Sequence, residues 1–122
     1  MAMTEQQRAR LAAGVERHLT PGEEVVDVTM GSLHELRKGK DRARATSVVV
    51  TDRRVLFYRK RLSGYDLRAR DLAQIAAVDQ GHGVVAGELR LTTRSGEIVR
   101  VTSMPKDDVE RIADAVRRRL TP

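Results

Sequence analysis

The sequence contains no cysteine and no tryptophan. The missing cysteine excludes a disulfide framework, a thiolate metal site and a cysteine nucleophile. Only three residues are aromatic, namely Phe57, Tyr58 and Tyr65, so Val, Leu, Ile and Ala must fill most of the core. A chain of 122 residues with 40% hydrophobic residues has a globular composition and a length that suits a single domain.

Long apolar runs are also missing. Residues 1–10 hold no apolar stretch of signal-peptide length, and no run of about 18 apolar residues could span a bilayer. We therefore expect a soluble, cytoplasmic protein. The net charge is +6, from 19 Arg and 4 Lys. Guanidinium groups suit nucleic acid, anionic lipid or acidic protein as partners, although codon usage in a GC-rich genome explains an arginine excess equally well.

An amphipathic helix is predicted over residues 5–18. Thr4 and Gln7 have the spacing of a capping box, and apolar residues then recur every fourth position. Residues 20–22, Thr-Pro-Gly, end this helix because proline cannot continue the hydrogen-bond ladder.

The apolar side of this helix is a candidate assembly face. It consists of Leu11, Val15 and Leu19. Such a face packs either on the chain's own sheet or on another subunit, and the sequence leaves both alternatives open.

Seven β-strands are predicted between residues 23 and 103, where short Val, Ile, Leu and Thr runs alternate in polarity between turn residues. The predicted strands lie near residues 24–34, 45–51, 54–60, 65–71, 74–80, 84–93 and 97–102. Consecutive hairpins of this length indicate an antiparallel meander.

A second helix is predicted to begin at residues 103–105, with Pro105 at the first helical position. Acidic residues at its start and arginines at its end suit the helix dipole. Its apolar stripe consists of Val109, Ile112, Ala113, Val116 and Leu120. Such a stripe needs a partner surface, and the open end of a strongly bent sheet offers one.

Four motifs in this order resemble the bacterial pleckstrin-homology (PH)-like family called YokE-like. They are SVVVTDRRVLFY at residues 47–58, DLAQIAAV at 71–78, GELRLTTRSGE at 87–97 and MPKDDVERIADAV at 104–116. The resemblance implies a mainly β (α+β), PH-like fold: a seven-stranded antiparallel bent sheet or barrel with a C-terminal capping helix. We expect the PH-like domain at residues 23–122, preceded by an extra N-terminal helix within residues 1–22.

Catalytic motifs do not emerge from the sequence. His18, His34 and His82 lack carboxylates at metal-ligand spacing, and no serine has a nucleophile-elbow context. The glycines of residues 81–87 lead into a predicted strand, whereas a dinucleotide fingerprint leads into a helix. We therefore expect no enzymatic activity, no metal and no cofactor.

A candidate anion or lipid site lies in the basic segment of residues 37–44. In lipid-binding PH domains, a lysine late in the first strand and a basic pair opening the second strand hold inositol phosphates, and Lys38, Lys40, Arg42 and Arg44 are similar in placement. Alternation puts Arg42 and Arg44 on one face, where two guanidinium groups can converge on a phosphate. The alternative is a solvated charged loop.

The function expected from the sequence is that of a non-enzymatic binding or adaptor module that acts through protein–protein contacts, including self-association. A groove between the C-terminal helix and a strand edge could receive an added strand. The alternative is peripheral binding of anionic or inositol-phosphate lipids through residues 37–44. Nucleic acid is the least favoured partner, because single-strand binders need more stacking aromatics than this chain has. The sequence names no particular partner.

Overall fold

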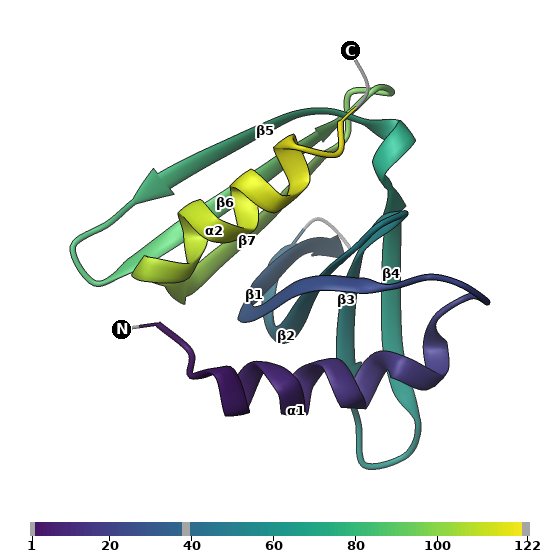
Figure 1. Ribbon diagram of the computed structural model, residues 1–122. Coiled ribbons are helices and arrows are strands. Elements are labelled where there is room, and N and C mark those ends of the chain that lie inside the picture. Colours follow the sequence, from purple (N-terminus) through teal and green to yellow (C-terminus); the bar gives the residue numbers. More distant parts are fainter. Residues whose placement is uncertain (1, 38–39, 121–122) are drawn as a thin grey trace.

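The computed structural model describes residues 2–37 and 40–120 and shows a seven-stranded antiparallel sheet with two helices (Figure 1). The strands are β1 (Val25–Arg37), β2 (Lys40–Thr51), β3 (Arg54–Lys60), β4 (Tyr65–Asp71), β5 (Ile75–His82), β6 (Ala86–Thr93) and β7 (Ile98–Pro105). The helical elements are α1 (Glu5–Val15), α2 (Lys106–Arg117) and the short 3₁₀ turns η1 (Glu16–His18) and η2 (Leu72–Gln74).

The strand order is β4-β3-β2-β1-β7-β6-β5. Strand β1 joins the two halves, because it pairs with β2 along its length and with β7 from Ser32 to His34. Strands β4 and β5 are the two edges of the sheet. The predicted PH-like bent sheet is therefore confirmed, in the open form and not as a closed barrel.

The main core lies between the concave face of the sheet and α2. Its members on α2 are the predicted stripe, with Val109, Ile112, Ala113 and Val116 fully buried and Leu120 packed at the border. The helix starts one residue later than predicted. Pro105 has extended backbone (φ −54°, ψ 127°) and ends β7, so Lys106 is the first helical residue.

Helix α1 covers a second, smaller core on the other face of β1–β4 (Figure 1). Strand alternation separates the two cores: Val48 and Val50 lie in the main core, whereas Val49 lies under α1. The predicted capping box is present, because the backbone N–H of Gln7 donates to Thr4 Oγ1 and the backbone N–H of Thr4 donates to Gln7 Oε1.

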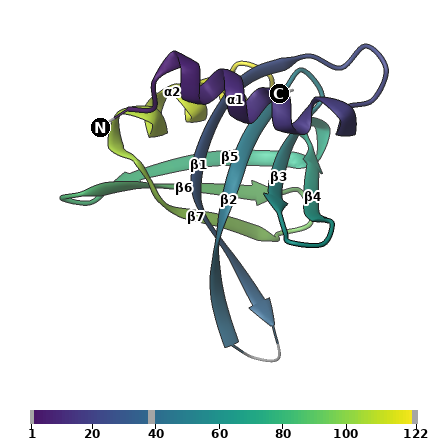
Figure 2. The same ribbon diagram turned by 90° about the horizontal axis from the view of Figure 1, so that it is seen from below.

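The β1–β2 hairpin projects from the body of the sheet as a long arm (Figure 2). Its strands stay paired from His34 with Ala43 to Arg37 with Lys40, although the sequence predicted a loop there. The charged residues of this segment hide the strand signal, since polar side chains on both faces remove the alternation. Neither helix within the described residues is long and apolar enough to cross a membrane.

Candidate anion-binding site

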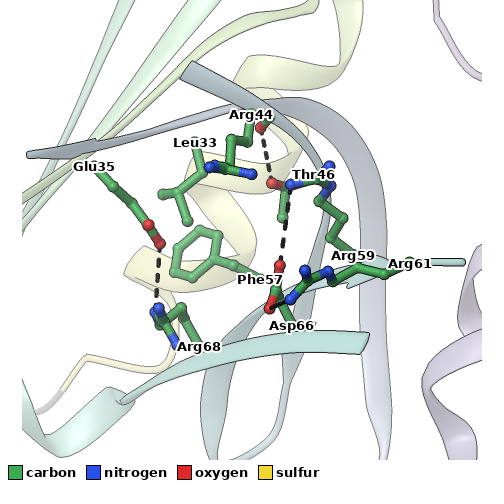
Figure 3. A pocket seen from close by; sticks show the side chains of 9 residues that line it. All are labelled: Leu33, Glu35, Arg44, Thr46, Phe57, Arg59, Arg61, Asp66 and Arg68. Carbon is green, nitrogen blue, oxygen red and sulfur yellow. Dashed lines mark hydrogen bonds and ion pairs between the residues drawn. The ribbon is translucent and has the colours of Figure 1, made fainter. Parts of the chain in front are cut away.

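A hollow of about 120 Å³ opens on the concave face of β1–β4 (Figure 3). It is lined by Leu33, Glu35, Arg44, Thr46, Phe57, Arg59, Arg61, Asp66 and Arg68, and we term it the arginine hollow. Four guanidinium groups and two carboxylates meet there, so the lining has a formal excess of two positive charges. Such an excess favours an anion.

Strand alternation explains why these residues meet. Side chains two positions apart on a strand share one face, which aligns Arg59 with Phe57 on β3. The register of the next hairpin pairs Phe57 with Arg68 and Arg59 with Asp66. Phe57 and Leu33 are nearly buried and belong to the main core, so the hollow has an apolar floor beneath charged walls.

Three of the four arginines are held by the two carboxylates. Arg61 Nη1 lies 3.4 Å from Asp66 Oδ1, and Arg59 Nη1 lies 4.0 Å from Asp66 Oδ2. Arg68 Nε lies 3.3 Å from Glu35 Oε1. The Arg59 Nη1 atom is buried and has no hydrogen-bond partner, so its donor capacity is not used fully.

Arg44 is the fourth arginine, and its guanidinium makes no hydrogen bond or ion pair to any residue that the structure describes. Beyond the β1–β2 ladder, its backbone oxygen accepts a hydrogen bond from Thr46 Oγ1 at 2.9 Å. Figure 3 shows its side chain at the hollow, beside Leu33. Arg44 therefore brings up to five unengaged N–H donors to a site with excess positive charge.

A shallower groove continues from the arginine hollow toward β7. Arg70 bridges it by donating to both carboxylate oxygens of Glu97, at 2.7 and 2.9 Å. These hydrogen bonds lower the pKa of Glu97 and raise that of Arg70. Arg70 and Glu97 neutralise each other, so the groove adds no net positive charge to the excess in the arginine hollow.

The structure divides the four residues of the predicted lipid site. Arg44 lines the arginine hollow, and Arg42 is exposed and lies outside its lining. Lys38 and the side chain of Lys40 fall outside the described part of the chain. The predicted site did not include Arg59, Arg61 and Arg68, although their spacing from Phe57 and the hairpin turn at residues 62–63 place them on one face.

The candidate assembly face packs within the chain. Val15 is fully buried, and Leu11 and Leu19 pack against the same cluster, which contains Val28, Val49, Leu56 and Tyr58. Of the two alternatives that the sequence left open, the structure therefore shows the intramolecular one.

Two histidines have definite structural partners. His34 Nδ1 lies 3.1 Å from Asp41 Oδ2, and its Nε2 lies 2.7 Å from Thr102 Oγ1, which links the arm to β7. The His18 ring packs against Tyr65, with centroids 4.2 Å apart and ring planes tilted by 46°. Both histidines thus connect separate elements of the fold.

Comparison with known proteins gives the same fold. A family model described as "Bacterial PH domain" matches residues 19–118. The C-terminal domain of an unknown protein from Leishmania infantum has a TM-score of 0.64 at 15% identity, covering 88% of this chain and 95% of that one. The PH domain of USP37 has a TM-score of 0.51 at 20% identity, covering 75% and 96%. No curated protein matches.

The fold and the family model define a PH-like domain, a class that generally serves as a non-catalytic binding module for proteins or lipids. The chain belongs to the bacterial PH domain family. Its closer similarity to YokE-like members remains a prediction, as does the domain boundary at residue 23.

Proposed function

We propose that this protein binds anionic membrane surfaces peripherally, taking a lipid phosphate group into the arginine hollow, and that it catalyses no reaction. The observation that carries this proposal is Arg44, whose guanidinium faces a positively charged hollow without a partner among the described residues. Arginine suits this role because its planar donors match phosphate oxygens two at a time.

The size of the hollow supports a small anionic group as ligand. At about 120 Å³ it is smaller than the roughly 300–1,000 Å³ of pockets that enclose whole drug-sized ligands. A phosphate presented by a surface needs only its oxygens inside, while the rest of the molecule stays outside.

The turn between β3 and β4 supports a lipid as the source of that phosphate. Leu62 is fully exposed there and follows the basic residues 59–61. An apolar side chain beside cations suits the boundary between headgroups and acyl chains.

Vesicle cosedimentation tests the proposal. Vesicles of phosphatidylcholine alone are compared with vesicles containing phosphatidylserine, and with others containing a phosphatidylinositol phosphate at equal total charge. At about 0.1 M salt we expect retention only on the anionic vesicles. Arg44→Gln should weaken vesicle binding about fivefold, which is the effect of one cation near an anionic surface. Free inorganic phosphate should compete with the vesicles for the protein if the hollow holds the lipid phosphate.

Arg10→Gln is the matched control. Arg10 is exposed on α1, outside the arginine hollow, so the same loss of charge should change vesicle binding less. Equal losses in both variants, or no retention on any anionic vesicle, would remove the proposal. Capture of an acidic peptide with no vesicle binding would instead assign the hollow to a protein partner.

A further inference from the structure

We infer that the free edge of β4 pairs with β4 of a second copy of this chain, which joins two sheets into one across a two-fold axis. The inference concerns the edge of the sheet and does not rest on lipid binding. Strand β4 forms the outermost edge of its half of the sheet in both ribbon views (Figures 1 and 2).

Hydrogen-bond alternation shows which β4 residues have free backbone groups. The Arg61 amide donates to the Gly64 carbonyl at 3.1 Å, which makes this a hydrogen-bonded pair of the hairpin. Such pairs alternate with non-bonded ones along an antiparallel ladder, so the register directs the N–H and C=O groups of Tyr65, Leu67 and Ala69 away from β3. The Arg70 side chain agrees with this, because it donates to the Ala69 carbonyl at 2.8 Å.

The charges on this edge complement those of a second copy. In an antiparallel pairing centred on Leu67, Leu67 lies opposite Leu67 of the second copy, and Tyr65 of each copy lies opposite Ala69 of the other. Asp66 of each copy then lies opposite Arg68 of the other copy, on the concave side of the sheet, so the charge pair occurs at two places in the contact. Opposite charges directly across a strand pair stabilise it, and the outward backbone groups of Tyr65, Leu67 and Ala69 find partners in this register. The Ala69 carbonyl can accept a second bond, since it has two lone pairs.

The opposite edge of the sheet, β5, is contacted by α2. Arg117 of α2 donates to the Val78 carbonyl at 3.3 Å and to the Gln80 side chain at 3.1 Å. These two bonds hold α2 against the β5 edge, and a strand edge that is partly covered is less open to strand addition. Pairing of β4 with β4 about a two-fold axis uses the same edge in both copies, so this contact closes at a dimer.

Sedimentation equilibrium on the full chain tests this inference. The edge is short, so we expect a weak dimer whose fraction rises between about 10 µM and about 1 mM. Arg68→Asp places Asp opposite Asp66 in both contacts, and should weaken dimerisation about tenfold. The double variant Asp66→Arg/Arg68→Asp restores opposite charges across the contact and should dimerise more tightly than Arg68→Asp.

Two further variants separate edge pairing from other contacts. Leu67→Pro removes an outward N–H that β3 does not use, and should abolish the dimer while thermal melting confirms a folded chain. Arg42→Asp makes the same charge change on the β1–β2 arm and should leave dimerisation unaltered. The inference is overturned by a monomer at every concentration, by a dimer that survives Leu67→Pro, or by a double variant no tighter than Arg68→Asp.

Discussion

Glu23 and Arg54 form a two-point ion pair: Arg54 Nε donates to Glu23 Oε2 and Arg54 Nη2 donates to Oε1, both at 2.9 Å. The Glu23 side chain is fully buried and also accepts from Thr51 Oγ1 at 2.6 Å. Arg54 Nη2 further donates to the His18 carbonyl at 3.1 Å. The pair therefore ties the end of the N-terminal helical segment to the β2–β3 turn.

This ion pair predicts a loss of stability in acid. The hydrogen bond from Arg54 is the main reason why the pKa of Glu23 falls from 4.5 to about 2. The unfolded chain binds the proton more readily, so the stabilisation is complete above pH 4.5 and disappears as the pH falls toward 2. Its size is about 3 kcal/mol. Urea denaturation across this pH range should show the decline.

Glu23→Gln should destabilise the chain at neutral pH by about 2–3 kcal/mol, because it leaves the Arg54 charge without its counterion. It should also flatten the pH dependence between 4.5 and 2. Glu24→Gln is the matched control, since Glu24 is exposed. A Glu23→Gln variant that loses stability in acid as steeply as the original chain would contradict this role.

Close packing of α2 on β6 predicts a strong effect of one methyl group. A Cβ at Gly87 would lie 2.1 Å from Val109 Cγ2, so Gly87→Ala forces the helix away from the sheet. We expect a destabilisation of about 1–3 kcal/mol, partly reversed by Val109→Ala in the same chain. Thermal and urea unfolding measure both variants.

Gly14→Ala provides the matched control for the Gly87 substitution. A Cβ there meets nothing within 4 Å, and Gly14 lies within α1. The substitution should therefore stabilise the chain by about 0.5–1 kcal/mol. Equal effects of the same sign at both glycines would show that α2 is not packed as described.

The buried position of Val15 predicts an effect on stability and none on assembly. Val15→Ala removes two methyl groups from the second core, and should destabilise the chain by about 2 kcal/mol. Ala13→Ser, on the exposed side of α1, should have little effect. If Val15→Ala changes the oligomeric state in solution but leaves the unfolding free energy unchanged, the α1 face forms a contact between copies and not the second core.

Local signals in the sequence were sufficient for elements that have clear ends. Strand β3 was predicted and found at residues 54–60, and β4 at residues 65–71. Turn residues lie at both ends of β3. Its apolar run fixes the register of its pairing with β2, because a shift by one residue would move each side chain to the other face of the sheet. The distal part of the β1–β2 arm was not predicted. Its backbone pairing extends beyond the hydrophobic core, so its sequence lacks the alternation of apolar and polar residues that marks a strand with one buried face.

The sequence by itself determined the seven strands of an antiparallel meander, the C-terminal helix and the capped N-terminal helix, because periodicity, caps and turns act over a few residues. Only the tertiary structure decided which surface α1 covers, since an apolar stripe specifies burial and not the partner. It also decided that Arg44 meets Arg59, Arg61 and Arg68 and which strand edge stays free. These relations join residues far apart in the chain, and the strand order and the bend of the sheet set them.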